Sequence, residues 1–158
     1  MSLKIKTLGE LVHRTSVSIA SDDSSQSFKG GEFVQINGDY EAEQVTAGET
    51  PTLLWQVFQD TYGRMDRLGT GKLTAVYGVY FADIDLYDVS SGSYTNGMDL
   101  TAKWCTTTDS DDEAATGCFV SPASSGDLVV AKCMCPPNSS PRGDGWMRIQ
   151  TVTPYTYA

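Results

Sequence analysis

The chain has 158 residues, of which 40% are hydrophobic, and its formal net charge is −9 at pH 7. This length is sufficient for one domain with a substantial core. The acidic balance argues against nucleic acid as a direct partner, because binding to phosphates needs a basic face.

The first thirty residues are predicted to form an extended N-terminal arm. They lack the apolar run and cleavage site of a secretory signal, so we expect the protein to be made and kept in a cytoplasm. The stretch "SIASDDSSQSFKGG" has little apolar periodicity, which is typical of a segment that orders on contact with a partner. We therefore expect an arm over residues 1–30 and a β-barrel domain over residues 31–158.

His13 is the single histidine and falls within this arm. Nucleophilic catalysis by Ser-His-Asp or Cys-His systems needs an imidazole that is rigidly oriented. We interpret His13 as a surface residue, which argues against most hydrolase mechanisms.

The next segments favour strands. "EFVQIN" alternates in polarity and is followed by the turn "NGD". "PTLLWQVFQDTYGRM" allows a helix capped by Thr50 with Pro51 at its first position, or a strand with Leu53, Trp55 and Val57 on one face. Because the neighbouring segments are β-like, we favour the strand.

Gly71 and Lys72, within "RLGTGKLT", look like the end of a phosphate-binding loop. Such a loop needs a glycine five positions before the G-K pair and a hydroxyl directly after it, but Asp66 and Leu73 occupy those positions. We predict a turn that leads into a strand.

The clearest strand signal is "KLTAVYGVYFADIDLYDV", residues 72–89. Its apolar side chains change face after Phe81, which indicates a bulge or a corner where the strand passes to another sheet. The nearly apolar run covers residues 73–82 and contains Thr74 and Gly78, so it is too short for a membrane span, and we expect no membrane partner.

Further strands are predicted for "MDLTAKW", "GCFVSP", "LVVAKCMC" and "WMRIQTV", with turns and an acidic loop between them. The total is about seven or eight short strands. The sequence therefore predicts an all-β protein with a single small barrel or sandwich.

Two groups of acids could support glycoside cleavage or bind a cation, namely Asp83, Asp85 and Asp88, and the loop from Asp109 to Glu113. Both groups fall in predicted turns or at a strand end, and the spacing does not fit a calcium loop. We interpret them as solvated turn acids, and we expect no metal, no cofactor and no catalytic residue.

The four cysteines allow three interpretations, which are a metal site, disulfides or reduced thiols. Zinc sites usually contain two closely spaced pairs, whereas one close pair occurs here. We favour buried, reduced thiols. The residues are Cys105, Cys118, Cys133 and Cys135.

Several aromatic residues could form a platform for sugar rings, although aromatic residues at strand spacing more often belong to a core or a subunit interface. The triplet Arg142-Gly143-Asp144 and the acceptor pattern at Asn138 are interpreted as loop features rather than as adhesion or glycosylation sites. The candidate aromatic residues are Tyr77, Tyr80, Tyr87, Trp104 and Trp146.

The order of these segments resembles a family of small capsid decoration, or cement, proteins of tailed bacteriophages. The similarity covers about residues 31–152 and includes "GKLTAVYGVYFA", the sequence "YD" followed by "YTNGMDL", and "SGDLVV" before a proline-rich loop. The acidic loop and the cysteines depart from the family pattern.

The resemblance implies a structural virion protein without enzymatic activity. Such a protein would bind the exterior of the assembled head as a homo-oligomer, with a trimer favoured over a dimer, and would stabilise contacts between subunits of the major capsid protein. Its assembly would take place in the cytoplasm of the bacterial host. The alternative is a carbohydrate- or host-surface-binding β-module of the virion, such as the base of a head fibre.

Overall fold

The structure is a computed structural model that describes residues 4–8, 13–19, 28–46, 54–57, 72–108 and 114–158. The regular structure of these residues consists of strands and two short 3-10 turns, which confirms the predicted all-β class. The strands are β1 (Lys4–Leu8), β2 (His13–Ile19), β3 (Phe33–Ile36), β4 (Glu41–Gln44), β5 (Leu54–Val57), β6 (Lys72–Tyr77), β7 (Tyr80–Ile84), β8 (Asp99–Thr108), β9 (Ala114–Pro122), β10 (Leu128–Cys135) and β11 (Met147–Thr156).

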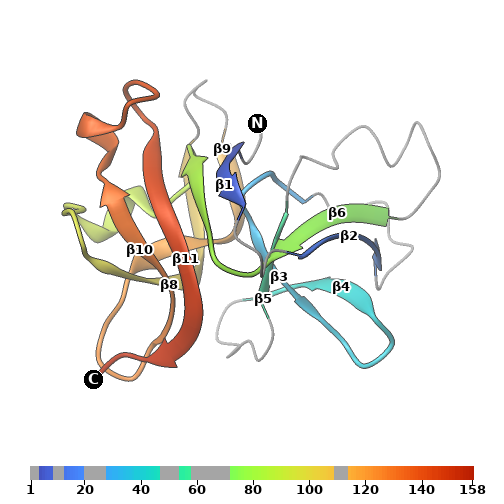
Figure 1. The fold of residues 1–158 in the computed structure, drawn as a ribbon. Coiled ribbons are helices and arrows are strands. Elements are labelled where there is room, and N and C mark those ends of the chain that lie inside the picture. The colour runs from blue at the N-terminus through green and yellow to red at the C-terminus, as the bar shows by residue number, and fades with distance from the viewer. Residues whose placement is uncertain (1–3, 9–12, 20–27, 47–53, 58–71, 109–113) are drawn as a thin grey trace.

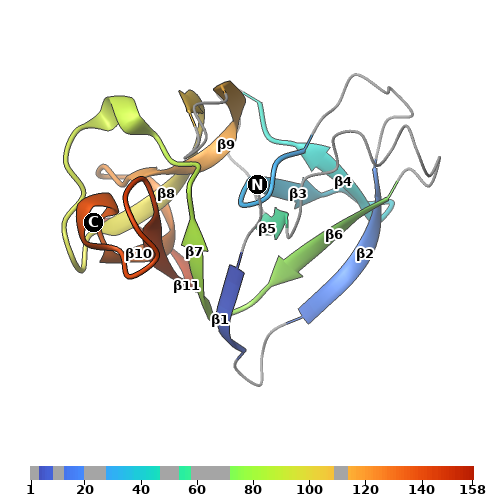
Figure 2. The same ribbon diagram turned by 90° about the horizontal axis from the view of Figure 1, so that it is seen from above.

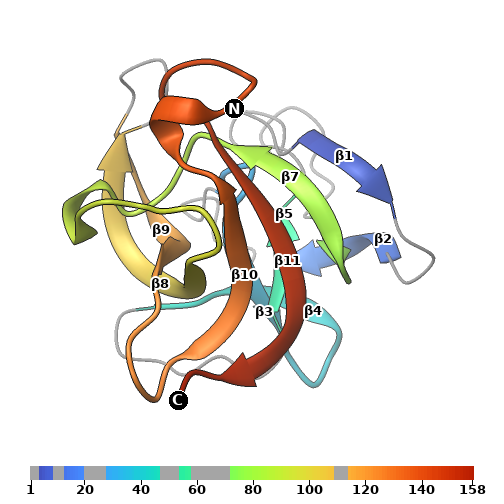
Figure 3. The same ribbon diagram turned by 60° about the vertical axis from the view of Figure 1, so that its left-hand side comes forward.

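The strands form two sheets. Five of them close into a barrel in the order β2-β4-β3-β5-β6, and six form an open sheet in the order β1-β7-β11-β10-β8-β9. Figure 1 shows the barrel beside the open sheet, and the view from above in Figure 2 separates the two units. The long antiparallel strands β10 and β11 curve across the open sheet (Figure 3).

The chain passes from the barrel to the open sheet between β6 and β7. Gly78 lies at this corner with φ of 125°, a conformation that side chains with a Cβ disfavour. The predicted change of sheet is therefore confirmed, although it occurs at Gly78 and not after Phe81. Beyond the corner, Tyr80, Ala82 and Ile84 point into the core.

The described parts of the N-terminal segment form strands that belong to the two sheets. β1 pairs with β7 at an edge of the open sheet, and β2 pairs with both β4 and β6. Val17 and Ile19 of β2 are buried inside the barrel. Two apolar residues spaced two apart among polar neighbours are enough for a barrel strand, so the boundary expected at residue 31 does not mark the start of the barrel.

The preferred strand around Trp55 is confirmed for β5, and the strand after Gly71 is confirmed as β6. β8 and β9 form the hairpin that carries the acidic loop, whose residues 109–113 lie outside the described residues. The described residues contain eleven strands, more than the seven or eight expected. The additional strands are short or rich in polar residues, such as β4.

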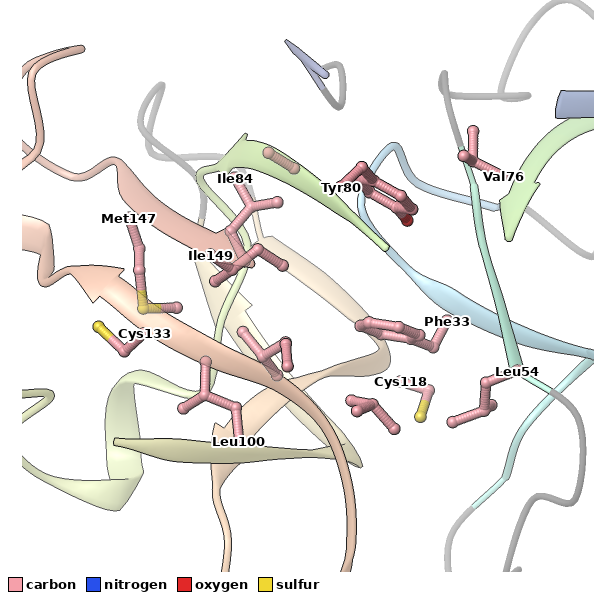
Figure 4. Close-up of a cluster of buried hydrophobic side chains, with 14 of the residues drawn as sticks. Phe33, Leu54, Val76, Tyr80, Ile84, Leu100, Cys118, Cys133, Met147 and Ile149 are labelled. Atoms are coloured by element: carbon pink, nitrogen blue, oxygen red, sulfur yellow. The ribbon is translucent and has the colours of Figure 1, made fainter. Parts of the chain in front are cut away.

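The largest buried cluster joins the two sheets. Phe33, Leu54 and Val76 of the barrel pack with Tyr80 and Cys118 of the open sheet (Figure 4). A second cluster fills the barrel interior around Phe28 and Val34. The barrel and the open sheet are therefore parts of one packed unit. Within the described residues, no helix has the length and apolar character that a membrane crossing requires.

Candidate functional site

A cavity of about 230 Å³ lies at the junction between the barrel and the open sheet. It is bordered by the β6–β7 corner, by β5 and by the second half of β11, and its walls are mostly apolar. Its lining residues include Phe33, Leu54, Val76, Tyr80, Val130 and Val152.

Buried hydrogen bonds hold this junction together. The Tyr80 hydroxyl donates to Oε1 of Gln56 at 2.7 Å, and Nε2 of Gln56 donates to the carbonyl of Gly31 at 2.9 Å. On the other side, the Thr151 hydroxyl donates to the carbonyl of Gly78 at 2.7 Å and accepts from the amide of Tyr80 at 2.9 Å. These groups fix the position of the corner, because any displacement that left one of them buried without a hydrogen-bond partner would cost free energy.

Asp83 and its neighbours do not lie in solvated turns, which corrects the expectation from sequence. Asp83, Asp85 and Asp88 are all buried. Asp83 accepts hydrogen bonds from Nε of Arg148 at 2.8 Å and from Nη2 at 3.3 Å. The cause is the register of β7 against β11, which places Asp83 opposite Arg148. This arrangement compensates a charge inside the fold.

Asp88 is surrounded by hydroxyl groups. Ser90 donates to it from both its amide and its hydroxyl, at 3.0 and 2.6 Å, and Ser121 donates at 3.1 Å. The Ser91 hydroxyl is a further donor. Burial raises the pKa of Asp88, but these hydrogen bonds outweigh it and hold the pKa below its ordinary value. Asp88 thereby fixes the turn after β7.

Glu32 is a buried acid that the sequence analysis did not single out. Its carboxyl group lies between the barrel and β9, and burial raises its pKa from 4.5 to about 7 despite hydrogen bonds from Gln44 and from the backbone of Lys29 and Cys118. The sequence feature that could have indicated this site is the position of Glu32 between the glycine pair at 30–31 and the apolar start of β3. That feature does not distinguish a buried acid from an exposed one.

The four cysteines are free thiols, of which Cys118 and Cys133 are buried and Cys105 and Cys135 are partly buried. Burial raises the pKa of Cys118 to about 12 and the pKa values of Cys105 and Cys133 to about 11. Since the thiolate is the reactive form of cysteine, these three side chains are poor nucleophiles near neutral pH. In the described part of the chain, no three cysteine, histidine or acidic side chains are grouped as a metal site requires.

Of the aromatic residues proposed as a sugar platform, one is buried in the core and the others are partly buried. Tyr80 is buried, Tyr77 packs against Trp55 with ring centroids 5.3 Å apart, and Tyr87 meets the edge of Tyr94 at 5.4 Å. Trp104 is half-buried on β8. The structure therefore does not gather the five candidate residues into one platform.

Two of the remaining candidates from the sequence, Arg142 and Trp146, lie in the loop before β11. The Arg142 guanidinium lies over the ring of Trp146, 3.6 Å from its centroid. Arg142 is thus part of a cation–π contact inside the loop. His13 lies in β2, opposite Tyr77 of β6.

No protein-family model, curated protein or solved structure matches this chain.

Proposed function

We propose that this chain is a structural virion protein that binds the outer surface of a phage head and stabilises contacts between major capsid protein subunits. The observation that carries the proposal is the resemblance in sequence over about residues 31–152. The fold is compatible with it, because the residues that carry the resemblance have defined structural roles.

One of these roles belongs to the segment between β7 and β8. The Tyr94 hydroxyl donates to the carbonyl of Asp88 at 2.8 Å, and the ring of Tyr94 meets the ring of Tyr87. Leu100 follows in β8 and is fully buried in the shared core. The residues of the pattern "YD" and "YTNGMDL" therefore form one folded connection, and Gly78 of "GKLTAVYGVYFA" forms the corner between the sheets.

The chemistry of the described side chains also supports a structural role. Asp83 and Asp88 are engaged in internal contacts, and three of the thiols have raised pKa values. The formal charge of −9 suits the exterior of a head, away from packaged DNA that would repel it. Many copies on a lattice would bind through multivalency, as a homo-oligomer that is a trimer rather than a dimer.

Co-sedimentation with empty heads tests the proposal. Purified protein is mixed with heads assembled from the major capsid protein of its phage, before and after expansion. A folded acidic β-protein of similar size and charge serves as the control. We expect saturable binding at a fixed number of copies per capsid subunit, with a preference for expanded heads. Protein that stays in the supernatant with both forms of the head would refute the proposal, and glycan binding would then be tested.

A further inference from the structure

The Glu32 carboxyl group connects the barrel to the open sheet. Oε1 accepts a hydrogen bond from Nε2 of Gln44 on β4 at 2.9 Å, and Oε2 accepts from the amide of Lys29 at 3.0 Å. The backbone of Cys118 on β9 provides a further hydrogen bond. The side chain has no exposed surface. A single buried carboxyl group thus contacts strands of both sheets.

Gly117 on β9 leaves the space that Glu32 occupies. A Cβ atom at Gly117 would lie 2.6 Å from Oε1 of Glu32, which is closer than such atoms approach in real structures. The carboxyl group is therefore packed directly against the backbone of β9.

Two titratable groups face Glu32 within the described residues. Lys29, in the loop before β3, favours the ionised carboxylate by its positive charge. Cys118, on β9, lies close enough that the Glu32 charge raises the pKa of its thiol. The contact from β4 is the neutral amide of Gln44. Burial of the carboxyl group outweighs Lys29 and the hydrogen bonds, and therefore favours the protonated form.

Gln44 can serve both protonation states. In the structure its amide NH₂ donates to Oε1, which suits a carboxylate. Rotation of the amide by half a turn would present its oxygen to a protonated Glu32, which could then donate its proton. The protonated form thus keeps a hydrogen bond and avoids a buried charge.

We propose that Glu32 is a proton-dependent latch, which holds the barrel against β9 when its carboxyl group is protonated and loosens this contact when it is ionised. This inference does not depend on the capsid function. The contact between the barrel and β9 should therefore be tighter in mildly acidic than in mildly alkaline solution.

The sign of the effect follows from the two states of the acid. A carboxyl group whose pKa is higher in the folded than in the unfolded protein stabilises the fold at low pH, and this contribution is lost as the pH rises through the folded value. The unfolded value is 4.5 and the folded value is about 7. Between pH 5 and pH 8, the unfolding equilibrium constant should therefore rise by roughly 70-fold on account of Glu32.

Urea unfolding of the full chain at pH 5 and pH 8 tests this dependence in the wild type and in Glu32→Gln. The glutamine has nearly the same shape and cannot ionise, so the variant should lose most of the pH-dependent change. The matched control is Glu43→Gln, because Glu43 lies on β4 next to Gln44 and bonds to Gln35 and Asn37 instead of β9. An equal pH response in wild type and Glu32→Gln would overturn the proposal.

A direct titration covers the case in which Glu32→Gln fails to fold. In wild-type protein labelled with ¹³C at the glutamate carboxyl groups, NMR should show one glutamate that titrates near neutral pH. Titration of all glutamates below about pH 5 would overturn the proposal.

Cys118 reports whether the contact itself opens. It is fully buried beside Glu32, while Cys133 is equally buried in the open sheet. At pH 8, we expect the backbone amide of Cys118, which bonds to Glu32, to exchange its hydrogen several-fold faster in wild type than in Glu32→Gln, with the amide of Cys133 unchanged. Equal rates for Cys118 in the two proteins would contradict a loosened junction.

Discussion

Arg148 compensates a carboxylate that lies inside the fold. Its guanidinium contacts both oxygens of Asp83, whose side chain is completely buried, while Arg148 itself remains 26% exposed. Removal of the cation would leave the charge of Asp83 in a poorly solvated position. At the scale of single residues, stability therefore depends on matched polar partners as well as on apolar packing.

Arg148→Met should lower the free energy of unfolding by about 2–4 kcal/mol, because it leaves a buried carboxylate without its guanidinium. Urea unfolding measures this loss. The matched control is Arg142→Met, which removes a cation stacked on Trp146 and should cost about 1 kcal/mol or less. Addition of Asp83→Asn to Arg148→Met should recover part of the loss. Equal effects of the two arginine substitutions would contradict this interpretation.

The four thiols differ in accessibility. Cys118 and Cys133 are fully buried, whereas Cys105 and Cys135 are partly exposed. Titration with a thiol reagent near pH 7 should detect four thiols in denaturant without reductant, and in native protein Cys118 and Cys133 should react most slowly. A count below four in denaturant would show that disulfides form.

At the scale of elements, the β6–β7 corner connects the two sheets. The chain leaves the barrel at Tyr77 and enters the open sheet at Tyr80, with only Gly78 and Val79 between them. The positive φ of Gly78 permits this abrupt change of direction. Thr151 of β11 then secures the corner by its hydrogen bond to the carbonyl of Gly78.

Gly78→Ala should destabilise the fold by about 1–3 kcal/mol, because a Cβ strains the backbone at this φ. Gly38→Ala is the matched control, since Gly38 has no positive φ and a Cβ there would meet no atom within 4 Å. Thermal unfolding of the two variants provides the comparison. An equally small decrease in melting temperature for both variants would mean that the corner does not require glycine.

The sequence predicted the elements whose apolar periodicity is strong. β6, β8, β10 and β11 were recognisable from alternation, and the change of parity near Phe81 indicated the corner. β2 was not recognised as a barrel strand, because only Val17 and Ile19 of its inner face are apolar. Its pairing with β6 supplies a context that local sequence does not contain.

The polar part of the junction was beyond sequence reasoning for a different reason. An acidic residue is more often exposed than buried, so Asp83 and Asp88 were expected in solvent. The strand register that brings Arg148 to Asp83 joins positions 65 residues apart. Likewise, the burial of Glu32 depends on β9, which pairs elsewhere with β8. Such contacts are set by topology and not by spacing.

At the scale of the whole molecule, the N-terminal segment contributes to both sheets. β1 lies at the edge of the open sheet, whereas β2 is required to close the barrel. A truncation intended to remove an arm would therefore also change the fold if it included β2.

Removal of residues 1–8 should leave a folded protein, because only the edge strand β1 is lost from the described structure. Removal of residues 1–30 should abolish cooperative unfolding of the barrel, since β2 pairs with β6 over six positions. Circular dichroism and urea unfolding distinguish these results. A truncation of residues 1–30 with the stability of the full chain would show that β2 is dispensable.

The most direct test of the central claim is the resistance of expanded phage heads to heat, with and without this protein bound. We expect saturating amounts to raise the temperature of head disruption by several degrees, and the shift to follow the bound copy number until the sites are filled. The control protein used for co-sedimentation should give no shift. Binding without any increase in the disruption temperature would contradict a stabilising role, even if the protein is a component of the virion.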